Sequence, residues 1–221
     1  MCSQEKELHM SSRRQPAQLK KQILAAFLLS LFILTPAPVF AREQTDALPS
    51  LQNFIESVKD GSINTLRGIY VQNVMAFPVV QQPSGNPGYV SANPAAVTQF
   101  KMAAKMGNIG LLAHNYLAGA DFSKLKKNDT ITLVYGDGHT QSFIVDDILE
   151  YQALSPLSPY SDFKDLAAQK TLTAEQLFNK VYRGDFHLTL QTCIQKDDDL
   201  SWGRLFIIAK PVSDKTAAFL N

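Results

Sequence analysis

One cysteine, one histidine and one arginine in this sequence are residue types that together can perform acyl transfer. Cys193 is the only cysteine downstream of residue 41. Its thiolate can attack a carbonyl carbon and form a thioester, and a histidine must then protonate the leaving amine. An arginine can donate two forked hydrogen bonds to the oxyanion that develops. His114 and Arg204 supply these groups, so the sequence indicates cysteine-dependent acyl transfer.

Three predicted strands carry these side chains. Residues 187–194 alternate with the period of a β-strand and contain Cys193, and a second strand is predicted over 204–212, beginning at Arg204. The two residues are 11 positions apart with a loop between them, a spacing that allows their side chains to meet across a hairpin. His114 closes a short apolar strand over 109–114. A strand end is a place where a barrel can direct a side chain into a cleft.

Strands dominate the rest of the pattern, and helices occur singly between them. A hairpin is predicted around Gly136-Asp137-Gly138, because Asp-Gly is a strong turn signal between alternating runs. Short antiparallel hairpins favour a closed barrel or a sandwich over a parallel sheet. The predicted elements are helices over 51–58, over 95–106 and from a cap at Thr171 or Thr173, strands over 68–75, 77–80, 130–135 and 140–149, and a loop over 81–95.

Residues 1–41 are predicted to be a targeting segment, either a signal peptide or a membrane anchor. A basic region precedes an apolar stretch over 23–34, and Val39-Phe40-Ala41 places small residues at a possible cleavage site. The 12 apolar residues fall short of the roughly 20 that span a membrane, but counting on to Ala41 gives 19, so both readings stay open. Either reading places the remainder of the chain outside the cytoplasm.

The remaining 180 residues are enough for one domain with a real core. We predict a linker and short helix over 42–65, a domain over 66–213 and a tail over 214–221. The whole chain carries a net charge of +1, of which residues 1–41 contribute +3, so the rest carries −2. A mildly acidic domain is excluded from nucleic-acid binding by electrostatics.

Three segments resemble the sortase family, and they occur in the family's order of histidine, cysteine and arginine. Residues 189–193 read Thr-Leu-Gln-Thr-Cys, which matches the Thr-Leu-X-Thr-Cys signature of sortases. Residues 111–115, Leu-Leu-Ala-His-Asn, resemble the sortase histidine segment. Residues 202–209, Trp-Gly-Arg-Leu-Phe-Ile-Ile-Ala, resemble the last strand, which carries the arginine. The resemblance spans about residues 66–212.

The resemblance implies a mainly β fold, a closed eight-stranded barrel with a few short helices. It implies a cysteine transpeptidase that cleaves a C-terminal sorting motif of an exported protein and passes the acyl group to an amine acceptor, on a cell-wall precursor or a pilin-like subunit. Cys193 would be the nucleophile, His114 the general acid and Arg204 the oxyanion or substrate stabiliser, with Thr192 contacting the peptide. No metal or cofactor is implied, and the enzyme would be secreted or anchored to the cell membrane.

Other interpretations remain open at this stage. On the same barrel, water could resolve the thioester, which would make the protein a thiol hydrolase. A non-catalytic peptide-binding barrel would hold an inert Cys193, since an isolated strand cysteine is usually a core residue. Arg204 could pair with the acidic run Asp197-Asp198-Asp199, which lacks the spacing of a calcium loop. His187 would lie ~20 Å along the strand from Cys193, too far to serve the thiol.

Overall fold

The computed structural model describes residues 48–212. The predicted targeting segment over 1–41, the first part of the linker and the tail over 214–221 lie outside these residues. Between 48 and 212, no helix is long and apolar enough to cross a membrane.

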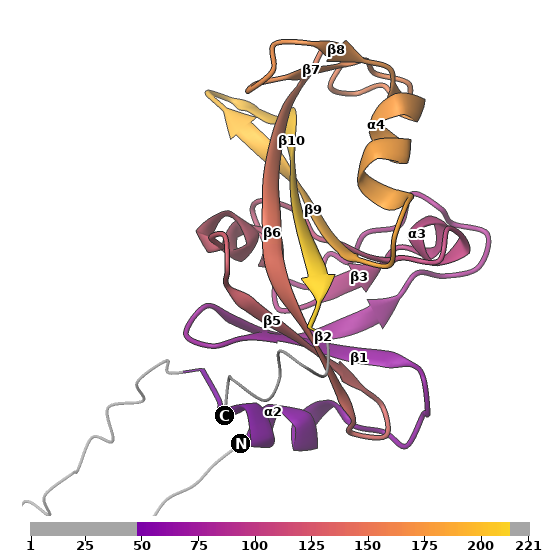
Figure 1. Ribbon diagram of the computed structural model, residues 1–221, viewed down its shortest axis with the longest axis vertical. Helices are drawn as coiled ribbons and strands as arrows, with labels where there is room; N and C mark the ends of the chain where they lie inside the picture. The colour runs from indigo at the N-terminus through magenta and orange to yellow at the C-terminus, as the bar shows by residue number, and fades with distance from the viewer. Residues whose placement is uncertain (1–47, 213–221) are drawn as a thin grey trace, which may run out of the picture. The chain divides into compact units, whose positions relative to one another are not determined.

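Eight strands of the described chain form a closed barrel, as predicted (Figure 1). Each strand is hydrogen-bonded to the next in the order β10-β9-β4-β3-β2-β1-β5-β6, and β6 pairs in turn with β10, which closes the ring. The pairs β2–β3 and β4–β9 are parallel, and the others in the ring are antiparallel. The barrel strands are β1 (Leu66–Val71), β2 (Met75–Gln81), β3 (Val97–Gln99), β4 (Ile109–Leu112), β5 (Thr130–Tyr135), β6 (Thr140–Ala153), β9 (Leu188–Lys196) and β10 (Asp199–Pro211).

The inside of the barrel is filled by aliphatic and aromatic side chains that alternate along each strand. On β9, Leu188 and Leu190 are fully buried in this core, so the intervening residues project outward. Two short strands, β7 (Phe163–Asp165) and β8 (Thr171–Leu172), extend the sheet outward from β6.

Helix α4 (Ala174–Tyr182) covers the outer face of β9 and β10. Its cap is Thr173, one of the two predicted positions, and a capping box with Gln176 completes its first turn. Val181 and Tyr182 pack with Phe206 of β10 in a second apolar cluster. The predicted helix over 51–58 is also present as α2 (Leu51–Val58), which packs Phe54 on the barrel surface.

The predicted helix over 95–106 is wrong in its first half. Residues 97–99 form strand β3, and only Lys101–Lys105 form a helix, α3. Val97 pairs with Val79 of β2, and Thr98 pairs with Leu112 of β4. Closing the barrel requires a strand between β2 and β4, and this tertiary pairing overrides the local helical pattern.

Strand boundaries differ from the prediction at two hairpins. The predicted strand over 68–75 is interrupted by a turn in which Asn73 has a φ of 60°, and Met75 then pairs back onto Val71. The predicted loop between Cys193 and Arg204 is largely strand, because Lys196 pairs with Asp199 and a tight turn joins them. A 3-10 helix, η1 (Ala118–Lys124), follows the histidine segment and was not predicted.

Candidate active site

Strands β9 and β10 place Cys193 and Arg204 directly opposite each other. The two residues are partners in the antiparallel register, with Thr192 opposite Leu205 at the next position. Directly opposite residues of an antiparallel pair project to the same face, with their Cβ atoms about 5 Å apart. Because Leu205 belongs to the barrel core, Cys193 and Arg204 lie on the outer face. Cys193 is a free, half-buried thiol.

The pairing of β4 with β9 brings the histidine segment alongside the cysteine segment. Leu112 is the partner of Gln191 in the parallel pair, and the Ala113 N–H donates to the Gln191 carbonyl at 3.2 Å. The ladder ends at this pair, and the same register continued by two more residues on each strand would set His114 opposite Cys193. The imidazole of His114 is half-buried and stacks on the exposed ring of Tyr116, with 5.2 Å between centroids.

Gly119 allows the histidine segment to lie close against β9. The His114 carbonyl accepts hydrogen bonds from the N–H groups of Leu117 and Gly119, both at 3.0 Å, which turns the chain into η1. A Cβ atom at Gly119 would lie 2.7 Å from the His114 carbonyl oxygen and closer still to the hydroxyl of Thr192. Only glycine fits between these groups without displacing one of them.

The Arg204 guanidinium is held by main-chain carbonyls. Its Nη1 donates to Ser201 and Gly203, both at 2.8 Å, and its Nη2 donates to Pro156 at 3.4 Å. A guanidinium has five N–H donors, so two remain available. No ion pair within residues 48–212 includes Arg204, so the acidic run at 197–199 does not pair with it.

Thr192 lies on the opposite face of β9 from Cys193. Its side chain is 4% exposed, and its hydroxyl oxygen is buried without a hydrogen-bond partner. This side chain lies against Gly119 of the segment that follows His114. The peptide contact that the sortase resemblance implies for Thr192 stays a prediction.

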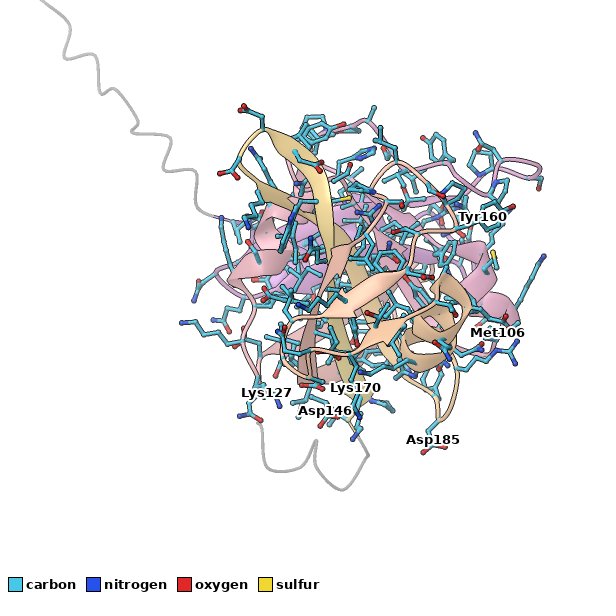
Figure 2. All side chains as sticks on the ribbon, turned by 90° about the horizontal axis from the view of Figure 1, so that it is seen from above. Met106, Lys127, Asp146, Tyr160, Lys170 and Asp185 are labelled. Carbon is cyan, nitrogen blue, oxygen red and sulfur yellow. The ribbon has the colours of Figure 1, made fainter. Side chains whose placement is uncertain are left out.

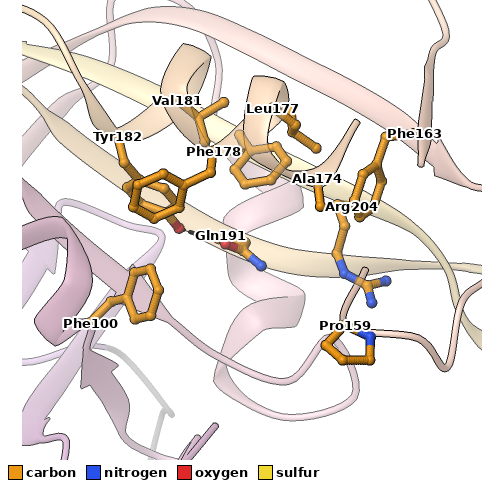
Figure 3. Close-up of a pocket in the computed structure, with 11 residues that line it drawn as sticks. Phe100, Pro159, Phe163, Ala174, Leu177, Phe178, Val181, Tyr182, Gln191 and Arg204 are labelled. Carbon is orange, nitrogen blue, oxygen red and sulfur yellow. Dashed lines mark hydrogen bonds between the residues drawn. The ribbon is translucent and has the colours of Figure 1, made fainter. Parts of the chain in front are cut away.

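Two hollows flank the Cys193–Arg204 pair. The aromatic groove has a volume of about 150 Å³, is lined by Gln191 and Arg204, and is covered by α4 (Figure 3). Its aromatic walls are Phe100, Phe163, Phe178, Tyr182 and Phe206. The polar cleft has a volume of about 270 Å³ and is lined by Cys193 and Glu150, with Asn115, Ser123, Thr192 and Gln195 around them.

Gln191, Tyr182 and Glu150 were not predicted as site residues. Gln191 is the variable position of the Thr-Leu-X-Thr-Cys segment, and strand alternation alone would have put it on the same face as Cys193. Tyr182 and Glu150 are distant in sequence and reach the site only through the fold. A loop that carries the exposed Tyr160 at the edge of the molecule forms the outer rim near Pro159 (Figure 2).

The other histidines of the described chain are structural or solvated. His187 is 8% exposed, and its two ring nitrogens lie 2.7 Å and 2.9 Å from the carbonyls of Asp185 and Val181. His139 stacks on Tyr135 in the β5–β6 turn. Among residues 48–212, no three His, Cys, Asp or Glu side chains gather as metal ligands would.

Neither protein-family models nor curated proteins match this chain. Among solved structures, it is similar to sortases. Sortase C-1 from Actinomyces oris is 15% identical over 90% of this chain and 99% of that chain, with a TM-score of 0.43. The pilus-related sortase C of Group B Streptococcus is 14% identical over 75% and 87%, with a TM-score of 0.44. Sortase A from Listeria monocytogenes is 15% identical over 72% and 97%, with a TM-score of 0.41. These are members of the family that the three sequence segments resemble.

Proposed function

We propose that this chain is a sortase-like cysteine transpeptidase. The observation that supports the proposal is the register of three adjacent strands. Cys193 pairs with Arg204 across β9 and β10, and the β4–β9 ladder ends two residues before His114 and Cys193. These are the three residue types that acyl transfer through a thioester requires.

The first half of the reaction forms an acyl-enzyme. The Cys193 thiolate attacks the carbonyl carbon of the scissile amide and forms a carbon–sulfur bond, and the carbonyl electrons move onto the oxygen. Arg204 donates its two free N–H groups to this oxyanion or to the neighbouring substrate carbonyl. The carbon–nitrogen bond then breaks, and the His114 imidazolium gives its proton to the leaving amine.

The second half transfers the acyl group to an acceptor. A free amine attacks the thioester carbon, neutral His114 takes the proton that the amine loses, and the Cys193 thiolate leaves. The two hollows suit two substrates, since the aromatic groove fits an apolar peptide segment and the polar cleft presents Glu150 to a cationic amine.

The substrate of this proposal is the C-terminal sorting motif of an exported protein. The acceptor is an amine on a cell-wall precursor or a pilin-like subunit. The predicted targeting segment over 1–41 would place the enzyme outside the cytoplasm, either secreted or tethered to the membrane. Water in place of the amine would make the protein a thiol hydrolase, and an unreactive Cys193 would make it a peptide-binding barrel.

The test is an acyl-transfer assay on the full chain. Quenched peptides of the Leu-Pro-X-Thr-Gly type are offered with and without triglycine, and the mass of the Cys193 peptide is measured. We expect a thioester on Cys193, an amine-dependent product, and loss of both in Cys193→Ala with unfolding unchanged. A thioester that only hydrolyses identifies the hydrolase. A Cys193→Ala variant with full activity, or a wild type with no adduct, contradicts the proposed function.

A further inference from the structure

A buried tyrosine fixes the direction of the one amide in the aromatic groove. The Tyr182 hydroxyl donates to the Gln191 Oε1 at 2.5 Å, a bond that joins α4 to β9 (Figure 3). Tyr182 is 2% exposed, and its ring is clamped by Phe100 and Phe178, each with 5.2 Å between centroids. Burial raises the pKa of the Tyr182 hydroxyl, so it stays protonated and remains a donor.

The consequence is that the Gln191 nitrogen points away from Tyr182. Figure 3 shows this nitrogen on the side of Arg204, within the groove. The Nε2 group has two N–H donors, and no acceptor within residues 48–212 bonds to either one. Apart from the Arg204 guanidinium, the surrounding walls are aromatic and aliphatic. The groove therefore presents one neutral hydrogen-bond donor of fixed direction beside the charged Arg204.

This donor lies close to the reacting atoms. Gln191 precedes Cys193 by two residues on β9, which is roughly 7 Å along a strand, and both project from the outer face. An engineered apolar cavity of about 150 Å³ binds benzene. The groove has about the same volume, so it can hold an apolar group of that size. A peptide segment that places one apolar side chain here must also cover the Gln191 amide. Without an acceptor of its own, it would leave that donor unpaired, which is costly.

We infer that Gln191 is a specificity-determining residue, which selects peptide segments that bring a carbonyl oxygen to its Nε2 beside the apolar group. Tyr182 is then a positioning residue, because it holds the amide with its donors facing the groove. The inference rests on the proposed function for the path of the peptide, but selection by the groove can be measured without any turnover.

The experiment traps thiol probes on Cys193 of the full chain as mixed disulfides at equilibrium. Three probes share a thiol arm and a benzyl group, joined by an amide, by a ketomethylene that keeps only the carbonyl, or by a trans-alkene that keeps neither polar group. We expect the amide and ketone probes to be retained about equally, and the alkene roughly five- to tenfold less. The measured quantity is the ratio of retention between matched probes on the same protein. A variant that is less stable overall therefore does not change this ratio.

Two variants and one control assign the effect. Gln191→Leu should abolish the preference, and so should Tyr182→Phe, which keeps the ring but lets the amide turn. Tyr151→Phe is the control, because its ring packs edge-on against Phe206 and its buried hydroxyl makes no hydrogen bond to Gln191, so it should keep the wild-type ratios.

The possible results separate the inference from the proposed function. Equal retention of all probes by the wild type, or a preference that persists in Gln191→Leu or Tyr182→Phe, overturns the inference even if the enzyme turns over. Selective retention without any acyl transfer supports the inference and contradicts the proposed function. Failure of every probe to exchange with Cys193 counts against both.

Discussion

Cys193 and Arg204 are cross-strand partners in the ladder between β9 and β10, on the outer face of the barrel. Both strands are also paired on their other sides, β9 with β4 and β10 with β6. The two side chains therefore stand on the interior of a sheet rather than on a loop, which fixes their separation before any substrate binds. Preorganisation of this kind is what stabilisation of an oxyanion requires.

Replacing Arg204 should lower kcat/KM strongly without unfolding the protein. We expect Arg204→Ala to cost about 10²–10³-fold, as the loss of an oxyanion donor does. Arg204→Lys should recover little, because an ammonium lacks the planar fork. Steady-state kinetics on the peptide substrate measure both. Arg67→Lys, which changes an arginine paired with Asp60, is the matched control and should retain activity. Equal rates for Arg204→Lys and wild type would exclude the proposed role.

Replacing His114 should remove the proton transfers of both half-reactions. His114→Asn is expected to lower kcat by about 10²–10⁴-fold, the range of general acid–base catalysis. The thiol should still exchange with disulfide probes, because Cys193 is unchanged. His139→Asn removes a histidine that stacks in the β5–β6 turn, and activity should persist. A His114→Asn variant with wild-type kcat would rule out this histidine as the acid.

Adding one methyl group at Gly119 should separate the histidine segment from β9. The new Cβ would meet the carbonyl oxygens of His114 at 2.7 Å and Ala113 at 2.9 Å, and the Thr192 hydroxyl more closely. We expect Gly119→Ala to lower the free energy of unfolding by about 1–3 kcal/mol and to lower kcat as His114 shifts. Denaturant unfolding and kinetics measure the two effects. Gly88→Ala, which has nothing within 4 Å, should leave stability near wild type, whereas equal stability of both variants would disprove the close packing.

Glu150 should favour transfer to an amine over hydrolysis. It lines the polar cleft with Cys193, and its exposed carboxylate attracts a cationic acceptor. Glu150→Gln is expected to lower the ratio of aminolysis to hydrolysis about two- to fivefold, the effect of one exposed charge pair. Product ratios at several triglycine concentrations measure this change, and high salt should reduce the difference. Glu175→Gln, in the exposed first turn of α4, should not alter the ratio.

Asp165 should make the stability of the groove wall depend on pH. Its carboxylate accepts from the Ala168 N–H at 2.8 Å and the Ala167 N–H at 3.0 Å, and it pairs with Lys180 of α4 at 3.3 Å. These bonds hold the pKa of Asp165 below its usual value, and the hydrogen bond from the Ala168 N–H contributes most to the shift. A lowered folded pKa gives stability that is present above the unfolded value of about 3.9 and lost as pH falls through the folded value.

We therefore expect the free energy of unfolding to decline as pH drops below about 4, and to decline less in Asp165→Asn. That variant should also be less stable at pH 7, because the bonds to Ala167, Ala168 and Lys180 weaken. Urea unfolding across the pH range measures both effects. Asp162→Asn, in the adjoining loop, should match the wild type at pH 7. Identical pH profiles for wild type and Asp165→Asn would contradict this role.

Local patterns predicted the elements whose stability is local. Helix α2 has the predicted bounds, and α4 begins after Thr173, because caps and the spacing of apolar residues act within a few residues of each other. The hairpin around Asp137-Gly138 was predicted for the same reason, since its turn fixes the register of β5 and β6.

The errors fall where distant partners decide the conformation. Strand β3 exists because β2 and β4 pair on its two sides, which no pattern within 95–106 reveals. The acidic run at 197–199 looked like a loop, but the β9–β10 ladder continues to Lys196 and Asp199 and leaves a tight turn. In both cases, hydrogen bonds to remote strands outweigh local composition.

Three features of the site follow from the sequence alone: the residue types, their order, and the face of β9 from which Cys193 projects. The last follows because strand alternation is a local property. The approach of the histidine segment to the cysteine segment required the fold, because it depends on the parallel pairing of β4 with β9, whose paired residues are 79 positions apart in the chain. The fold also decided that Tyr182 orients Gln191. Contacts of this kind arise from barrel closure and from packing of α4, and neither is encoded in the spacing of the residues involved.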